Sequence, residues 1–519
     1  MPHTHIAPTG VPGSPLTLTG ARIAPWELEQ IAVNGRPVEL SPGAVERIEQ
    51  SNRTLHEAIG AGTALYGVNT GFGSLARQRV PDHELADVQR NLLRSHAAGV
   101  GPALPDPIVR AMMTLLACSL SRGHSGVRPV VVQTLIEILN AGISPLVPET
   151  GSVGASGDLA PLAHACLALI GEGEVRVGDQ VVQASDALKK AGIEPIELGP
   201  KEGLALINGT HLMAARGALT LVAIRRLIDA AMCAAAMSID AVRATDSFLD
   251  DRVHTIRCQL GQRSVAARLR DLLRGSEIIP SHREDDPRVQ DPYSFRCVPQ
   301  VLGAALDQIE HSARVIEREL EAVTDNPLIF ASTDEEPDRR TVVSAGNFHG
   351  MPLAMALDTI SIALCHVSGM AERRVFFMLA ASDPQNPINP HLSRHPGVES
   401  GYMITQYTAA ACCNEMITLA TPASVSNIST CAGMEDYNSF GPRAAAKAER
   451  SMDLCRKVIA IELLCAAEAL EYQRPMRSGA GVERAFDAVR TVVPRLQADR
   501  SPARDIRAIE DLIASGRLG

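Results

Sequence analysis

The feature that most restricts the fold is a set of long runs rich in Ala, Leu and Ile in the second part of the chain. Their apolar side chains recur at the spacing of one helix face, which predicts helices of many turns. Only 3% of the residues are aromatic, so Ala, Leu, Ile, Val and Met must fill the core and permit close helix approach. We therefore expect a bundle of unusually long helices, at residues 211–245, 299–323, 352–381, 401–419 and 442–472.

The first part of the chain is mixed in character. Residues 174–182 alternate about a Gly-Asp pair as a β-hairpin does, and residues 33–38 form a strand-like run with a turn inside. Helical runs such as 109–121 and 130–140 surround them. The fold class expected is mainly α: an elongated bundle of long helices with a smaller mixed α/β N-terminal region that carries the active-site loops.

A chain of 519 residues exceeds the usual size of one domain. Residues 1–16 hold Pro, Gly, Thr and His without the basic-then-apolar order of a signal peptide, so they are expected to be a disordered lead-in. A mixed region is expected over 17–210, and the long-helix bundle with a C-terminal helical region over 211–519.

Charge and cysteine usage exclude several classes of partner. The net charge of −10 argues against a nucleic acid or an anionic membrane as partner. The eleven cysteines show no C-x-x-C spacing, so we expect no metal site and a cytoplasmic location. The stretch 212–242, interpreted as the most apolar long one, is interrupted by charged residues such as Arg225 and Asp229. No span able to cross a bilayer is therefore expected.

Residues 151–159 contain a tripeptide, Ala155-Ser156-Gly157, that can become an electrophile. If the chain bends sharply there, the Gly157 amide nitrogen can attack the Ala155 carbonyl, because no Cβ on glycine blocks the approach. Loss of two waters then leaves a methylidene-imidazolone ring. Asp158 is expected to cap the following helix, with Pro161 in its first turn. By itself, Ala-Ser-Gly before a capped helix indicates only a turn.

The longer run at residues 151–163 resembles the signature of the aromatic amino acid ammonia-lyases and aminomutases. Matching segments extend from residue 65 to residue 440, so the resemblance covers most of the chain. It implies a methylidene-imidazolone prosthetic group formed from Ala155, Ser156 and Gly157, with no external cofactor. It also implies a small-molecule amino acid substrate and a homotetramer with shared active sites.

The run at residues 65–73, Leu-Tyr-Gly-Val-Asn-Thr-Gly-Phe-Gly, lacks the Gly-Lys-Ser/Thr ending of a phosphate-binding loop. Taken alone it is typical of a flexible turn with a partly buried tyrosine. It resembles the family's mobile inner loop, which implies that Tyr66 is the general base. A tyrosinate near positive dipoles is basic enough to help remove a weakly acidic β-proton.

Two separated positions point to an imidazole substrate. Ser95-His96 resembles the pair that faces the side chain in histidine-acting members, and His96 would bond an imidazole. Glu435 falls where those members carry glutamate and the phenylalanine or tyrosine lyases carry glutamine. A carboxylate can fix an imidazole tautomer or assist proton removal. Each residue also has a simpler interpretation, His96 as a structural histidine and Glu435 as part of a helix cap.

The remaining candidates follow from the same resemblance. Asn208, otherwise a helix cap, would touch the ring or the substrate carboxylate. Arg296 would hold that carboxylate bidentately with Tyr293 and Gln290 beside it, although the segment could be a salt-bridged surface turn. Phe348 would form an apolar wall against the ring.

The function expected is elimination of ammonia from L-histidine to give trans-urocanate, with Tyr66 taking a β-proton while Arg296 holds the carboxylate. A histidine aminomutase is the first alternative, followed by a tyrosine or phenylalanine ammonia-lyase. A catalytically silent helical scaffold is the alternative from another class. The chain departs from the histidine lyase pattern at four positions, which bear on substrate choice: His211, Met351, Met434 and Tyr437.

Overall fold

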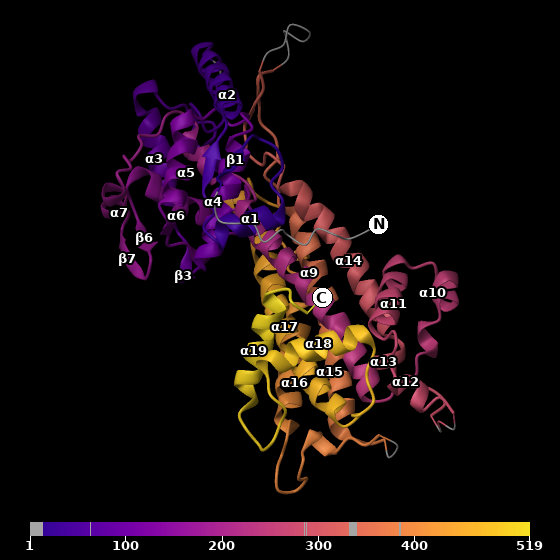
Figure 1. Ribbon diagram of the computed structural model, residues 1–519. Coiled ribbons are helices and arrows are strands. Elements are labelled where there is room, and N and C mark those ends of the chain that lie inside the picture. Colours follow the sequence, from indigo (N-terminus) through magenta and orange to yellow (C-terminus); the bar gives the residue numbers. More distant parts are fainter. Residues whose placement is uncertain are drawn as a thin grey trace. The chain divides into compact units, whose positions relative to one another are not determined.

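The computed structural model describes residues 14–62, 64–284, 286, 288–331, 340–383 and 386–518. The chain forms two compact units that are interleaved along the sequence (Figure 1). The first comprises Met1–Leu219, Arg314–Leu357 and Ala423–Ala446, and the second Thr220–Ala313, Asp358–Pro422 and Lys447–Gly519. The expected division at residue 210 stays a prediction.

Helix α4 (Asp106–Leu120) is central to the first unit. Pro107 lies in its first turn, where a missing N–H costs no helical hydrogen bond, and twelve of its fifteen residues are buried. Helices α1 (Pro25–Ala32) and α5 (Pro129–Asn140) pack on it. α2 (Pro42–Gly60) packs on α5, and α7 (Ala184–Ala191) packs on a hairpin.

Three further helices of the first unit pack on one another: α3 (Leu85–His96), α6 (Leu159–Leu167) and α8 (Glu202–Ile207). Each has a candidate site segment at one end. Ser95 and His96 end α3, the Ala-Ser-Gly tripeptide precedes α6, and Asn208 follows α8. This helix trio therefore gathers three segments that lie far apart in the sequence.

The sheets are small. The hairpin expected at residues 174–182 is confirmed: β6 (Glu174–Val177) pairs antiparallel with β7 (Gln180–Gln183), and β4 (Ile143–Pro145) extends it. The strand expected at 33–38 is wrong, because Gly35 turns the chain at a φ of +71° and the strand begins at Val38. The other strand pairs are β1 (Leu16–Leu18) with β2 (Val38–Leu40), β3 (Val100–Ala103) with β5 (Pro148–Thr150), and β8 (Leu328–Ile329) with β9 (Val342–Val343).

β1 begins at Leu16, inside the segment expected to be a disordered lead-in. It pairs in parallel with β2, with Leu16 opposite Val38. Residues 1–13 of that segment lie outside the described residues.

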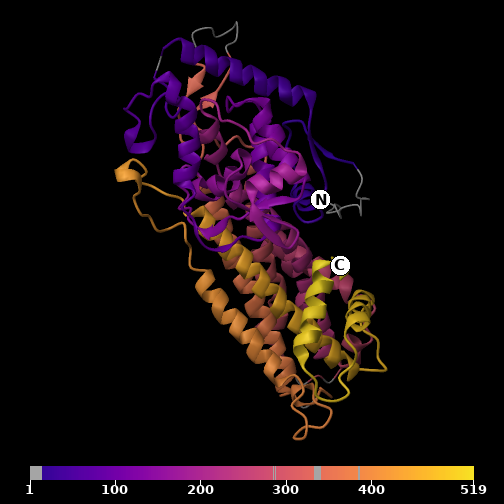
Figure 2. The ribbon, with the colours of Figure 1, turned by 90° about the vertical axis from the view of Figure 1, so that its left-hand side faces the viewer.

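The expected mainly α fold is confirmed, and every predicted long run contains a long helix. α15, α16 and α17 run alongside one another (Figures 1 and 2). The long helices are α9 (His211–Ala241), α14 (Val298–Glu319), α15 (Met351–Ala380), α16 (Met403–Leu419) and α17 (Gly441–Glu471). The second unit adds α10 (Asp251–Arg257), α11 (Leu260–Leu272), α12 (Ile278–Ser281), α13 (Tyr293–Arg296), α18 (Ala480–Val492) and α19 (Pro502–Ala514).

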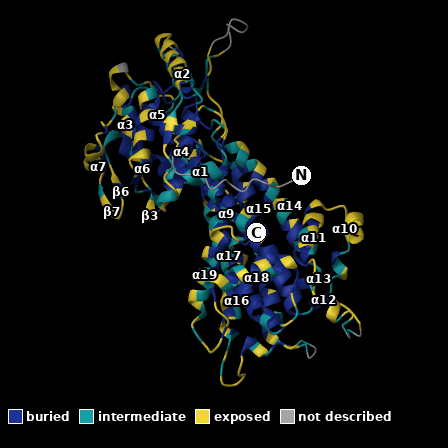
Figure 3. Ribbon diagram, in the orientation of Figure 1, coloured by how far each residue is buried: buried dark blue, intermediate teal, exposed yellow. Residues whose placement is uncertain are grey.

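The core of the second unit is formed by helices with few aromatic side chains. Residues 458–470 of α17 are buried on every side (Figure 3), and most of them are Ala, Ile, Leu or Cys. Such a helix is hydrophobic all round because neighbouring helices cover all of its faces. The predicted core composition is therefore confirmed for this unit.

Helix α15, and not the stretch 212–242, is the helix that length and composition would allow to cross a membrane. Charged residues interrupt α9 but spare a window of α15, so the helix with the long apolar window is not the one indicated by the stretch 212–242. Of that window, 61% is buried inside the protein, as in the core helix of a soluble protein.

A buried ion pair joins two helices of this core. Arg374 of α15 donates from Nε to Glu462 Oε1 of α17 at 2.5 Å, and both side chains are 0% exposed. Ser238 of α9 donates its hydroxyl to the same carboxylate oxygen at 2.8 Å. Two charges can be buried here because each is paired and hydrogen-bonded.

We expect Arg374→Met to lower the free energy of unfolding by about 3–5 kcal/mol, because Glu462 is then left buried without a cation. Urea unfolding followed by circular dichroism measures this. Arg450→Met is the matched control, since Arg450 and Glu415 form an ion pair between α17 and α16 that is 48% and 43% exposed. Its loss should cost less than about 1 kcal/mol. Equal small losses in both variants would contradict the expectation.

Candidate active site

The backbone around Ala155-Ser156-Gly157 bends sharply. Ser156 has a φ of +51°, and the flanking Gly154 and Gly157 have φ values of +80° and +83°. Gly154 and Gly157 pair as an isolated antiparallel bridge, so the chain reverses over the two residues between them. A serine in the left-handed region is strained unless its surroundings hold it there. The chain is therefore bent at the tripeptide, where the resemblance implies that the Gly157 nitrogen attacks the Ala155 carbonyl.

Gly157 packs directly against the backbone of Gly209. A Cβ added at Gly157 would lie 2.1 Å from the Gly209 carbonyl oxygen, so only glycine fits. The Gly209 N–H donates to the Ser156 carbonyl at 3.0 Å, and the Asp158 N–H donates to the Gly209 carbonyl at 2.8 Å. The tripeptide is thus attached to the turn that follows Asn208, and its geometry fits the ring that the resemblance implies.

Asp158 corrects one expectation. It stands at the N-cap position of α6, but its side chain makes no capping bond there. Its Oδ2 instead accepts the N–H groups of Leu212 and Met213, at 2.8 and 3.1 Å, in the first turn of α9. Burial raises the pKa of Asp158 to about 7, although these hydrogen bonds favour the carboxylate. Asp158 therefore anchors the tripeptide to the positive end of α9.

The other side of the tripeptide contacts the segment that carries Glu435. The Phe440 N–H donates to the Val153 carbonyl at 3.0 Å. A Cβ added at Gly154 would lie 2.1 Å from Ser439 Oγ. Residues 434–440 therefore lie against the N-terminal side of the bend.

Tyr66 lies half-buried in the inner loop. The Gly73 N–H donates to its phenolic oxygen at 3.1 Å. Burial raises the pKa of Tyr66, the Gly73 N–H lowers it, and the Glu435 carboxylate raises it. The short helix at Gly73–Leu75 packs against the short helix at Cys431–Gly433, so the inner loop contacts the Glu435 segment.

Gln89 is a positioning residue that the sequence interpretation missed. Its side chain is fully buried on α3, donates to the Gly67 carbonyl at 3.1 Å and accepts the Leu204 N–H at 3.1 Å. It thereby connects the residue after Tyr66 to α8. The sequence did contain one indication of this role: Gln89 lies on the apolar face of α3 with Leu85 and Leu92, where a glutamine side chain must find hydrogen-bond partners.

His96, Tyr66 and Glu435 share one electrostatic neighbourhood. Burial lowers the pKa of His96, and the Glu435 carboxylate raises it, as it does that of Tyr66. The exposed Ser95 places its hydroxyl 3.1 Å from His96 Nδ1. Thr430 donates its hydroxyl to Glu435 Oε2 at 2.9 Å and so orients the carboxylate. A largely neutral imidazole, a carboxylate and a tyrosine are suited to acid–base chemistry.

Phe348 is half-buried, and the next residue joins its segment to the Glu435 segment. His349 Nε2 lies 3.0 Å from the Tyr437 carbonyl, and His349 Nδ1 accepts the Met351 N–H at 3.3 Å. These two partners require the proton on Nε2, so His349 is a structural link. Two of the atypical residues, Met434 and Tyr437, are 64% and 65% exposed.

Asn208 is the C-cap residue of α8 and is buried. Its amide nitrogen donates to the Asn326 carbonyl at 2.8 Å and to Asp325 Oδ1 at 3.2 Å. Asp325 also pairs with Lys201, whose Nζ lies 2.5 Å from Oδ2 and whose side chain is fully buried. This ion pair fixes Asn208 and could not be inferred from the sequence.

Gln290, Tyr293 and Arg296 belong to the second unit. Gln290 and Tyr293 are exposed, and the Arg296 guanidinium lies 4.4 Å from the centre of the Tyr293 ring. Arg296 Nε donates to the Asp291 carbonyl at 2.9 Å. That these three residues join the residues of the first unit in one site stays a prediction.

Comparison with known proteins gives consistent matches. The model of the family described as aromatic amino acid lyase matches residues 24–491. A histidine ammonia-lyase of Gloeobacter violaceus is 45% identical over 503 residues, covering 97% of this chain and 96% of that protein. The crystal structure of histidine ammonia-lyase from Trypanosoma cruzi has a TM-score of 0.88 at 37% identity, covering 97% of this chain and 94% of that one. A tyrosine aminomutase from Streptomyces globisporus has a TM-score of 0.90 at 32% identity, covering 97% and 98%.

We expect Glu435→Gln to lower the pKa of Tyr66, because the variant removes a negative charge that disfavours the tyrosinate. Ultraviolet pH titration measures this, with Tyr66→Phe protein as the reference for the other tyrosines. Asp436→Asn is the matched control: Asp436 is the adjacent exposed carboxylate and does not contribute to the Tyr66 shift. An unchanged Tyr66 titration in Glu435→Gln would refute the shared neighbourhood.

Proposed function

Because this chain belongs to the aromatic amino acid lyase family and is a carbon–nitrogen lyase, we propose that it eliminates ammonia from L-histidine to give trans-urocanate. The observation that carries the proposal is the common neighbourhood of His96, Glu435 and Tyr66. His96 and Glu435 are the two positions that indicate an imidazole substrate, and the Glu435 carboxylate raises the pKa of both His96 and Tyr66. The histidine ammonia-lyase relatives support the same substrate.

Tyr66 takes the β-proton in this proposal. The Gly73 N–H at its phenolic oxygen favours the charged form, which is the form that accepts a proton. His96, with its pKa lowered by burial, hydrogen-bonds the substrate imidazole as a neutral ring. Glu435, oriented by Thr430, fixes the tautomer of that imidazole or assists proton removal.

The amino acid end of the substrate is assigned to the other candidates. Arg296 holds the carboxylate with its fork of donors, and Tyr293 and Gln290 lie beside it in sequence. Asn208 touches the ring or the carboxylate, and Phe348 forms an apolar wall.

We assign Ala155, Ser156 and Gly157 as the source of a methylidene-imidazolone, which, once formed, supplies an electrophilic carbon for the substrate amine. Support comes from the bend at Ser156 and from the contact of Gly157 with Gly209, which leaves no room for a side chain. Asp158 holds the C-terminal end of the tripeptide on α9. No external cofactor is needed.

A histidine aminomutase is the second candidate. The similarity to a tyrosine aminomutase supports it, since the same residues serve when ammonia is added back. Glutamate at 435, where tyrosine- and phenylalanine-directed members carry glutamine, favours histidine over those substrates. The presence of Tyr66, Asn208 and Arg296 argues against a silent scaffold.

We further propose a cytoplasmic homotetramer with shared active sites and with neither a nucleic acid nor a membrane as partner. α16 supports an interface between copies of the chain. It exposes three large apolar side chains, Ile404, Tyr407 and Ile417, at 58%, 60% and 62%. Exposed apolar surface of this kind is typical of protein interfaces. The unpaired state of the eleven cysteines fits a reducing compartment.

With L-histidine, we expect the protein to release ammonia and an ultraviolet-absorbing urocanate, and its intact mass to lie two waters below that of the unmodified chain. Ser156→Ala should abolish product formation and remove part of the mass difference, because the methylidene carbon and one of the two lost waters derive from Ser156. Ser515→Ala, a serine near the C-terminus, is the control and should behave as wild type. A new isomeric amino acid without urocanate, seen by proton NMR, would favour the aminomutase. Unchanged histidine would direct the search to tyrosine and phenylalanine.

We expect Tyr407→Glu to dissociate the assembly, because it places a charge at the centre of the exposed apolar face of α16. Light scattering coupled to size-exclusion chromatography measures the mass, and activity should fall with it if sites are shared. Val181→Glu is the control, since Val181 is an apolar residue 49% exposed on β7. A tetramer that persists in Tyr407→Glu would exclude α16 from the interface.

A further inference from the structure

We propose that Arg288 is a positioning residue for substrate binding: it clamps the segment bearing Tyr293 and Arg296 onto the C-terminal end of α9. The inference rests on the proposed function, in which Arg296 holds the substrate carboxylate. Arg288 itself is not one of the candidate site residues that the sequence motifs indicate. All residues of the argument belong to the second unit.

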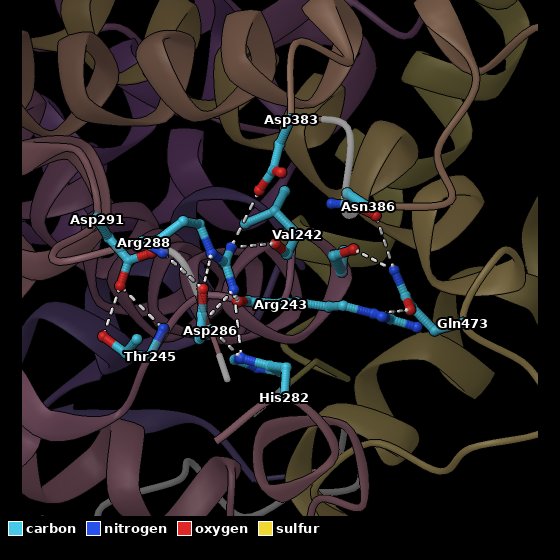
Figure 4. A network of polar contacts seen from close by, with 11 residues as sticks. Val242, Arg243, Thr245, His282, Asp286, Arg288, Asp291, Asp383, Asn386 and Gln473 are labelled. Atoms are coloured by element: carbon cyan, nitrogen blue, oxygen red, sulfur yellow. Dashed lines mark hydrogen bonds and ion pairs between the residues drawn. The ribbon is translucent and has the colours of Figure 1, made fainter. Parts of the chain in front are cut away.

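The guanidinium of Arg288 is engaged on every nitrogen (Figure 4). Its Nε and one terminal nitrogen form a two-pronged contact with Asp286, at 2.9 and 2.8 Å. The other terminal nitrogen lies 3.3 Å from Asp383 Oδ2 and 3.3 Å from the Val242 carbonyl, and the Arg243 carbonyl accepts a further bond. The Arg288 side chain is only 19% exposed. Such a saturated, mostly buried guanidinium is fixed in place.

The two carbonyls bound by Arg288 follow the last residue of α9, where helical N–H partners run out. A cation at this position also compensates the negative end of the helix. Gln473 makes two further hydrogen bonds at this helix end: its side chain donates to the Ala241 carbonyl at 2.7 Å and accepts a bond from Arg243 Nε at 2.9 Å. Arg288 is thus bound to the two residues that follow the C-terminal end of α9 (Figure 4).

The clamp continues from Arg288 to Arg296. Asp291 Oδ2 accepts both the N–H and the hydroxyl of Thr245, at 2.9 and 2.6 Å, so a second residue of the segment is attached just past α9. The carbonyl of the same Asp291 accepts Arg296 Nε at 2.9 Å. The direction of the Arg296 side chain therefore depends on where Asp291 is held.

Burial of the two middle residues of α13 then decides which side chains are presented. Ser294 and Phe295 are buried, with the Ser294 carbonyl accepting Arg374 at 3.2 Å and the Phe295 ring packed edge-on against Phe377. Tyr293 and Arg296 lie on the other side and stack on each other. Within the described residues, the terminal nitrogens of Arg296 have no hydrogen-bond partner and are available to a carboxylate.

Arginine is required at position 288 because the acceptors lie around a planar fork. Two carboxylates and two carbonyls are reached from three nitrogens with five N–H groups. Lysine has three donors on a single nitrogen and cannot span this set. We therefore expect Arg288→Lys to restore only part of the function lost in Arg288→Met.

The test compares wild type, Arg288→Met and Arg283→Met. Arg283 is the matched control, an arginine of the same segment whose pair with Asp246 is 63% and 44% exposed. In Arg288→Met we expect the KM for L-histidine to rise about 10- to 100-fold, the loss that a misplaced charge-assisted bond produces. Competitive inhibition by imidazole-4-acetate, which has a carboxylate, should weaken similarly, whereas histamine, which has none, should bind as in wild type.

Hydrogen exchange of the peptide covering residues 288–297 is measured on the same proteins without substrate. Faster exchange of this peptide in Arg288→Met than in Arg283→Met, beyond any change in peptides elsewhere in the second unit, supports the clamp. Exchange equal to that of the control, or equal weakening of both inhibitors, overturns it. Asp383→Asn removes the negative charge of one acceptor of Arg288 and should reproduce part of the effect. If wild type releases no ammonia from histidine, the proposed function fails, and the exchange comparison still decides whether Arg288 holds the segment.

Discussion

The contact between the backbones of Gly157 and Gly209 is the constraint on which the first unit depends. A Cβ added at Gly157 would lie 2.1 Å from the Gly209 carbonyl oxygen, so a side chain does not fit there. The two segments also cannot separate without breaking the hydrogen bonds between them. This contact keeps Ser156 in a left-handed conformation that an isolated peptide would leave. Folding therefore imposes the bend that cyclisation of the tripeptide needs.

The polar groups around this bend are held by partners from distant segments. Asp158 is bound by the first turn of α9 and the inner loop by Gln89, whereas Glu435 is bound by Thr430, five residues earlier in the same loop. Each partner offers an N–H or O–H to an acceptor that is at least partly removed from water, where an unmade bond is costly. Burial favours the uncharged form of both groups, because it lowers the pKa of His96 and raises that of Tyr66. The proposed chemistry uses the neutral imidazole of His96, and the Gly73 N–H at the Tyr66 oxygen favours the tyrosinate that acts as base.

The second unit holds its candidate residues through contacts at the end of a long helix. The C-terminal end of α9 has carbonyls without helical partners, and side chains from the segment at 286–291 bind there and just beyond it. Arg374, which is paired with Glu462 in the core, donates to the Ser294 carbonyl of α13, the helix that follows this segment. Tyr293 can be exposed and Arg296 partly exposed because Ser294 and Phe295, which lie between them, are buried.

The sequence by itself determined the long helices, the hairpin at 174–182 and the family, because helix periodicity, turn residues and motifs are local properties. Its motifs also indicated candidate site residues, from Tyr66 to Glu435, whose roles stay a prediction. Only the tertiary structure decided that Asp158 binds α9 instead of capping α6, that His349 is a link, and that Gln89, Lys201 and Arg288 hold the segments. It likewise located the apolar window in α15. The reason is physical: a hydrogen-bond partner or a burial cost depends on residues tens to hundreds of positions away, which no local pattern encodes.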